Sequence, residues 1–212
     1  MDLLPQFPLQ LVLYPGEELN LHIFEPRYRQ LILEAEENGS TFGIPAFIDN
    51  RVMGIGTEAE LLGIEETYAG GEMDVRTRGV GLYTIEEFFD PAPDRLYAAA
   101  RVKSVETEDE TDIVLGARVL ELTEQLYRLL KVDHPVPADV SELYTYDIAH
   151  HVGLNLQQEY ELLSIADEYG RLEFILEHLE HVLPVVEKTE QLKKKALMNG
   201  HFKNILPPDF SK

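Results

Sequence analysis

The chain has 212 residues, of which 44% are hydrophobic and 27% charged, a balance typical of a folded globular protein rather than a disordered or fibrous one. Its 39 acidic and 18 basic residues give a net charge of −21, and such a surface repels nucleic acids and anionic membranes. The absence of cysteine excludes disulfides, thiolate-ligated zinc and a cysteine nucleophile. Because no apolar run could cross a bilayer and the first residues do not resemble a signal peptide, we expect a cytoplasmic protein.

The first hundred residues are patterned mainly as strands. Residues 19–23 alternate between aliphatic and polar side chains, which predicts a half-buried strand, and residues 9–14 are predicted to form the strand before it. Pro15 and Gly16 between them predict a type II turn, because proline presets φ and glycine accepts the positive φ that this turn requires.

One helix is predicted to interrupt the strands, over residues 26–38. Proline stands at its first position, an Asn-Gly pair closes it, and its apolar residues recur at helical spacing on one face. A glycine-rich hairpin tip is predicted at residues 69–72. The remaining predicted strands cover residues 41–48, 52–66, 73–89 and 96–106, and the glycines within them indicate a strongly curved sheet.

The hydrophobic period changes from strand-like to helical after Glu106. Helices are predicted over residues 115–130, 141–151 and 155–167, and from Arg171 onward with a kink at Pro184. Six of the eight lysines follow residue 187. We therefore predict three parts: a β-rich subdomain over residues 1–107, a helical subdomain over 108–198 and a basic tail over 199–212.

A long motif near the amino terminus resembles a known family. Its most specific residues are Pro15, Gly16, His22, Phe24, Glu25, Pro26, Arg27 and Tyr28. With further matches as far as Arg171 and Leu172, roughly residues 5–183 are similar to the amino-terminal substrate-binding domain of Lon proteases. The resemblance implies an α+β fold, in which a curled PUA-like β-sheet with one inserted helix is followed by a C-terminal helical bundle. It also implies a role in binding substrates or partner proteins.

Within this motif the charged residues are interpreted as structural. We expect Glu25 and Arg27 to pair where the strand meets the helix, and Phe24 and Tyr28 to enter the core. The histidine pairs at 150–151 and 178/181 are likewise interpreted as structural, because no carboxylate–histidine spacing typical of a metal site accompanies them.

The sequence contains no Gly-Lys pair, although a phosphate-binding P-loop requires one, and it leaves no room for the separate Ser-Lys peptidase domain of Lon. We therefore expect no catalysis, no cofactor and no metal. A name inherited from full-length Lon would overstate the chemistry of this chain.

The leading hypothesis is a non-catalytic module that binds unfolded polypeptide or a partner protein, with a possible place in protein quality control. Aromatic residues flanked by acids combine apolar area with charge selectivity, and an open sheet edge would add main-chain hydrogen bonds. The candidate contacts are Tyr68, Tyr83, Phe88 and Phe89, and Tyr144 and Tyr146 are further apolar candidates. Two alternatives stay open: a small hydrolase with an unrecognised acid and histidine site, and a nucleic-acid-binding PUA-like protein, against which the net charge argues.

Overall fold

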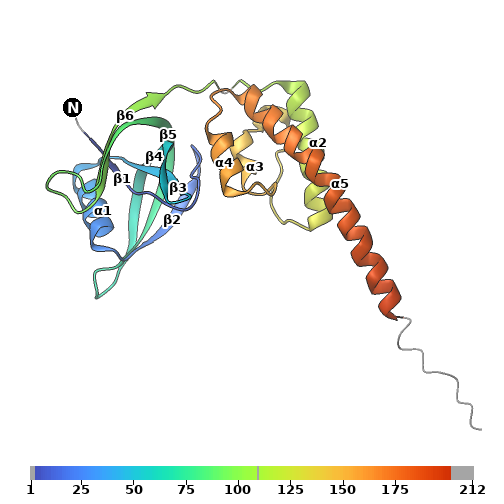
Figure 1. Cartoon of the computed structure of the whole chain (residues 1–212), viewed down its shortest axis with the longest axis horizontal. Coiled ribbons are helices and arrows are strands. Elements are labelled where there is room, and N and C mark those ends of the chain that lie inside the picture. The colour runs from blue at the N-terminus through green and yellow to red at the C-terminus, as the bar shows by residue number, and fades with distance from the viewer. Residues whose placement is uncertain (1–2, 109, 202–212) are drawn as a thin grey trace, which may run out of the picture.

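The computed structural model describes residues 3–108 and 110–201, which form a β-rich part followed by a helical part (Figure 1). The strands are β1 (Leu4–Gln6), β2 (Glu18–Ile23), β3 (Phe42–Ile48), β4 (Arg51–Thr67), β5 (Met73–Phe89) and β6 (Ala98–Val105). The helices are α1 (Pro26–Asn38), α2 (Ile113–Leu130), α3 (Thr145–Ala149), α4 (Leu156–Leu163) and α5 (Glu168–His201), with a short 3-10 helix η1 (Val140–Glu142). Among the described residues, none of these helices combines the length and the apolarity that crossing a membrane requires.

The six strands form one sheet that curls until it closes. Their order is β2-β5-β4-β3-β1-β6, and β6 pairs with β5 as well as with β1. The long strand β5 makes this closure possible, because its first half pairs with β2 and its second half with β6. The curled α+β architecture is thus confirmed. The sheet is less open than expected, since β2 alone among the described strands has a single neighbour.

The predicted strand at residues 9–14 is wrong. Leu9 makes only an isolated bridge to Ala46, and the first strand forms earlier, at β1. Residues 12–14 are buried without strand pairing because they face two cores in turn: Leu13 packs into the sheet's core, while Tyr14 packs against the helices. Three consecutive side chains in this segment are therefore buried because the segment runs between two hydrophobic cores.

The turn that follows, and the inserted helix, form as predicted. Gly16 has a φ of +86°, and the Glu17 amide donates to the Tyr14 carbonyl at 3.2 Å, which closes the turn. Helix α1 buries Tyr28 and three aliphatic residues against the sheet. Glu25 and Arg27 form the expected ion pair at 2.9 Å.

Phe24 corrects the prediction for this motif, because 62% of its surface is exposed instead of buried. It follows the last residue of β2 and precedes the helix, where alternation turns its side chain away from the core-facing Ile23.

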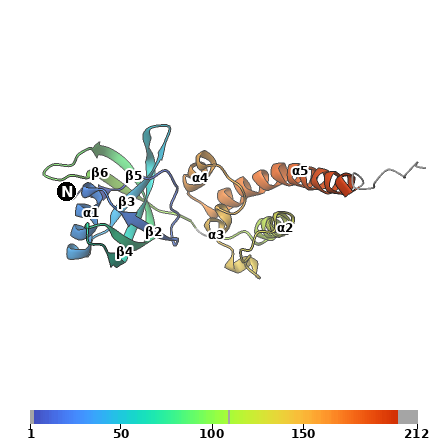
Figure 2. The ribbon, with the colours of Figure 1, turned by 90° about the horizontal axis from the view of Figure 1, so that it is seen from below.

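The helical part differs from prediction mainly at helix ends. The region predicted as one helix over residues 141–151 is divided into η1 and α3, because Tyr144 between them is extended. The capping box of Asn155 and Gln158 opens α4 as predicted, but α4 ends at Leu163. Helix α5 begins at Glu168, packs along α2 and continues past Pro184 to His201, beyond the other helices (Figures 1 and 2). The predicted basic tail thus begins within α5, and its residues 202–212 lie outside the described part of the chain.

The two parts share a core. Among the described residues, one cluster contains twenty buried hydrophobic side chains. Most of them lie on α2 to α5 or in the segments that connect these helices, and Ala46, Ile48 and Leu82 among the twenty come from the strands. The strands end at Val105 and the helices begin at Ile113, so the division near residue 107 remains a proposal about how the chain is organised.

Candidate functional site

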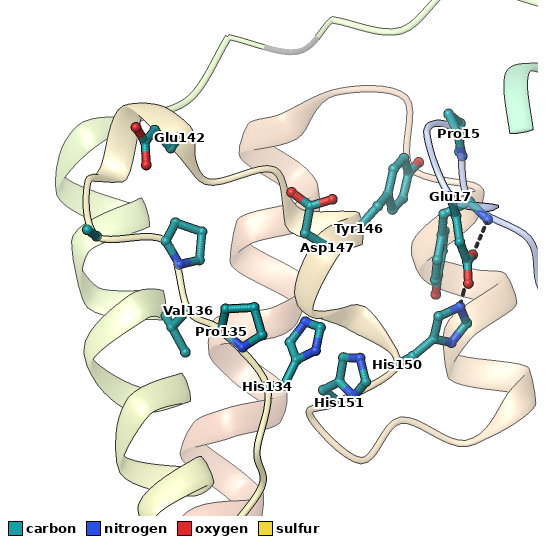
Figure 3. Close-up of a pocket in the computed structure, with 13 residues that line it drawn as sticks. Pro15, Glu17, His134, Pro135, Val136, Glu142, Tyr146, Asp147, His150 and His151 are labelled. Atoms are coloured by element: carbon teal, nitrogen blue, oxygen red, sulfur yellow. Dashed lines mark hydrogen bonds and ion pairs between the residues drawn. The ribbon is translucent and has the colours of Figure 1, made fainter. Parts of the chain in front are cut away.

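A cleft of about 670 Å³ lies where the sheet meets the helices (Figure 3). The turn at Pro15 forms one wall, and residues 134–138, η1 and α3 form the others. Most of its lining is apolar and comes from Pro135, Val136 and Tyr146 together with neighbouring residues. The cleft therefore combines segments that are more than 100 residues apart in the sequence.

A stack of aromatic rings fixes the floor of the cleft. The rings of Tyr14 and Tyr146 lie 4.6 Å apart at an angle of 16°, and the Arg171 guanidinium lies 4.8 Å from the centre of the Tyr146 ring. Arg171 is itself held by Glu168 at 2.7 Å, and both side chains are fully buried. Glu168 also accepts a hydrogen bond from the Thr145 amide at 2.8 Å, at the start of α3. Tyr146 is thus held from both sides.

His150 joins the two parts of the molecule at one end of the cleft. Its ring nitrogens contact Glu159 on α4 at 2.8 Å and Glu17 on the turn at 3.2 Å. Burial acts to lower the pKa of His150, but hydrogen bonds to the two carboxylates and their charges outweigh it and raise the pKa to about 9. His150 is therefore protonated at neutral pH and bridges two carboxylates.

Two further hydrogen bonds connect the parts beside this bridge. The Tyr14 hydroxyl donates to the Glu159 carbonyl at 3.2 Å, and the Tyr160 hydroxyl accepts from the Ile55 amide at 3.1 Å. Both tyrosines bond across the junction to backbone groups, which holds the turn and α4 in a fixed relation.

The rest of the cleft lining carries further ionisable groups. The rings of His134 and His151 stack at 3.7 Å, and burial together with the neighbouring histidines lowers the pKa of His151. Burial raises the pKa of Asp147, although His134 opposes this effect. Neither Asp147 nor Glu142 has a side-chain hydrogen bond or ion pair within the described part of the chain.

The side chains that line the cleft limit the chemistry that it can offer. Among the described residues that line the cleft, none is a Ser, Thr, Cys or Lys that could act as a nucleophile. Within residues 3–108 and 110–201, no group of three or more His, Asp or Glu side chains is arranged to hold a metal ion. The hydrolase alternative therefore gains no support from this cleft.

The four predicted contact residues lie outside the cleft, in three places. Tyr68 is 38% exposed at the tip of the β4–β5 hairpin, where its hydroxyl donates to Asp74 at 2.6 Å. The centre of the Tyr68 ring lies 5.9 Å from the centre of the His22 ring. The centre of the His22 ring lies in turn 6.3 Å from the centre of the Phe24 ring. We call His22, Phe24 and Tyr68 the hairpin patch.

Tyr83 belongs to the core, because only 1% of its surface is exposed. Its hydroxyl donates a hydrogen bond to the Gln6 side chain at 2.7 Å. Its ring packs against Gly43 and Gly56 so closely that any side chain at either glycine would collide with it. This burial keeps Tyr83 from contacting a ligand directly. Phe88 and Phe89 are half-buried neighbours on β5 and point to opposite faces, so they do not form one surface.

Sequence reasoning found part of the cleft lining but not the cleft. Tyr146 is among the apolar candidates that the sequence offers, whereas residues 134–137 fall between two predicted helices and carry no functional prediction. The proline-rich composition of that loop was the available signal, because prolines present a rigid apolar surface.

The comparisons with known proteins agree with this fold. The structure is similar to a Lon N-terminal domain protein from Xanthomonas campestris, with 28% identity and a TM-score of 0.64, covering 83% of this chain and 98% of that one. It is also similar in fold to the N-terminal domain of a Mycobacterium avium complex Lon protease, with 19% identity and a TM-score of 0.64, covering 84% and 98%. A comparison with curated proteins gave no match. The family model of the ATP-dependent protease La (LON) substrate-binding domain matches residues 3–181, and the chain therefore belongs to that family.

Proposed function

We propose that this chain binds polypeptide, holding an extended segment of a client or partner protein in the cleft. The family's description as a substrate-binding domain supports a binding role. The observation that carries the proposal is the cleft itself: an apolar lining, a floor fixed by the Tyr14–Tyr146 stack and a few polar groups at its ends. Ligand sites in proteins commonly have this composition.

The size of the cleft favours a chain segment as its ligand. Its volume of about 670 Å³ accommodates a few side chains, whereas a folded domain would need a broader surface. The prolines contribute apolar area without much loss of side-chain freedom on binding, while the buried Tyr14–Tyr146 stack keeps the floor beneath them rigid. A role in protein quality control would follow if the clients are unfolded proteins.

The hairpin patch is a second proposed contact surface. It contains Tyr68, one of the predicted contacts, together with the exposed ring of Phe24. The neighbouring strand β2 has one unpaired side, which an extended segment could join by main-chain hydrogen bonds. Phe88 and Phe89 stay as predicted contacts at the far end of β5.

The test is a fluorescence anisotropy titration of a labelled unfolded peptide with variants that fill the cleft. Ala138 is exposed and lines the cleft, so Ala138→Trp occupies part of it; Ala117→Trp adds the same side chain to the exposed face of α2. We expect Ala138→Trp to weaken binding at least about tenfold, as loss of a central contact does, and Ala117→Trp to bind like the unmodified chain. Circular dichroism melts check that both variants fold. Equal binding by the two variants would place the site elsewhere, and no binding by the unmodified chain would refute the function.

A further inference from the structure

We infer that the cleft selects polypeptide segments carrying a lysine or arginine side chain, which places its positive charge at Asp147 and its aliphatic stem along the apolar wall. This inference rests on the proposed function and adds the class of ligand. It depends on three features of the cleft: its carboxylates, the absence of lysine and arginine from the described residues that line it, and its apolar lining.

Asp147 is the central group. Figure 3 shows it between Tyr146 and the loop that carries Pro135 and Val136. Asp147 is an exposed residue, yet the protein around its carboxyl group removes enough water to raise the pKa of Asp147. An added cation stabilises such a carboxylate more than a fully hydrated one. Glu142, from η1, adds another carboxylate to the lining of the cleft.

The cations near the cleft are already engaged. His150 bridges Glu17 and Glu159, which leaves this group of three with an excess negative charge. The lowered pKa of His151 favours its neutral form at pH 7. No lysine or arginine occurs among the described residues that line the cleft. A basic side chain of a ligand therefore meets no lysine or arginine among these lining residues that would compete for Asp147 and Glu142.

The apolar lining explains why a basic side chain fits better than a small cation. Lysine and arginine carry aliphatic stems that pack on apolar surfaces while their charged ends reach a polar group. Pro135, Val136 and Pro137 provide such a surface beside Asp147. The charge of −21 on the whole chain adds long-range attraction for basic segments and repulsion of acidic ones.

The experiment compares unfolded peptides that differ at one position, which holds lysine, norleucine or glutamate, in anisotropy titrations at low salt. Norleucine keeps the apolar stem of lysine without its charge. We expect the lysine peptide to bind about fivefold more tightly than the norleucine peptide, in the range of a partly exposed ion pair. The glutamate peptide should bind most weakly, and high salt should reduce the lysine preference.

Two matched variants locate the charge that is responsible. Asp147→Asn removes the carboxylate in the cleft, and Asp94→Asn makes the same change at an exposed position of the β5–β6 loop. We expect the lysine preference to disappear in the first variant and to persist in the second. Equal binding of lysine and norleucine peptides would overturn the selectivity and leave polypeptide binding intact, whereas no binding of any peptide would overturn both. An unchanged preference in Asp147→Asn would also contradict the inference.

Discussion

Arg171 and Glu168 form a fully buried ion pair directly behind the aromatic floor of the cleft. Burial of two charges is costly unless each finds its partners, and here Arg171 also donates to the Ile165 and Ala166 carbonyls at 3.1 and 3.2 Å. Because Glu168 bonds to the start of α3, this pair fixes both the orientation of Tyr146 and the position of its helix. The pair's main consequence is therefore the rigidity of the cleft.

Removing one partner of this pair should destabilise the chain strongly. Arg171→Leu leaves Glu168 buried without its cation, so we expect a loss of about 3–5 kcal/mol in the free energy of unfolding. Urea denaturation measures this loss. A double variant, Arg171→Leu with Glu168→Leu, should lose less than the single one, and a double variant that loses as much or more would show that the charge imbalance is not the cause.

The His150 bridge should make stability depend on pH. The pKa of His150 is raised from its ordinary 6.5 to about 9 in the folded chain, so its protonated form stabilises folding. This contribution is complete below pH 6.5 and is lost as the pH rises toward 9 and above. We expect the free energy of unfolding to fall by about 1–2 kcal/mol over this pH range, because solvent contact reduces the full effect of the pKa shift of His150.

The measurement compares the free energy of unfolding of the unmodified chain and His150→Gln between pH 6 and pH 10. The advantage of the unmodified chain should shrink across the window from about 6.5 to 9 and then stay constant. A difference that does not vary with pH would mean that the bridge between Glu17 and Glu159 does not depend on a protonated imidazole.

At the scale of elements, the sequence predicts those helices, turns and strands that depend mainly on neighbouring residues. Helix α1, the capping box of α4, the turn at Gly16 and five of the six strands follow from spacing, caps and turn residues. The segment at residues 9–14 was mispredicted because its apolar residues serve two cores, a property of tertiary packing. The cleft was not predictable for the same reason: Glu17 and His150 meet across 133 positions of sequence.

Helix α4 illustrates how a local signal positions the site. The Asn155 side chain accepts a hydrogen bond from the Gln158 backbone amide at 3.0 Å, and the Gln158 side-chain oxygen accepts one from the Asn155 backbone amide at 3.0 Å. This box orients the first turn of α4, from which Glu159 bonds to Tyr14 beside the Pro15–Gly16 turn and Tyr160 bonds to Ile55 on β4. We expect Asn155→Ala to cost about 1 kcal/mol in the free energy of unfolding, measured by urea denaturation.

A change at the neighbouring exposed position Gln157 serves as the control for that variant. Gln157→Ala removes a side chain from the same turn but leaves the capping box intact, and it should change stability much less. Equal losses in the two variants would show that the cap does not contribute specifically.

At the scale of the whole molecule, a closed sheet and a helical bundle are joined through one shared core, one histidine bridge and one aromatic stack. The cleft lies at this junction, where rigid elements from both parts supply its walls. This placement resembles the common location of ligand sites between structural units. The net charge of −21 on the whole chain adds a preference for the charge of the ligand without setting its sequence.

Polypeptide binding in the cleft is tested most directly by an NMR titration of isotope-labelled protein with an unfolded, lysine-containing peptide. We predict that the amide signals that shift with increasing peptide belong mainly to α3, to residues 134–138 and to the turn around Gly16, which form the walls of the cleft. Shifts confined to strands remote from these segments, or no shifts with peptide in large excess, would contradict the account.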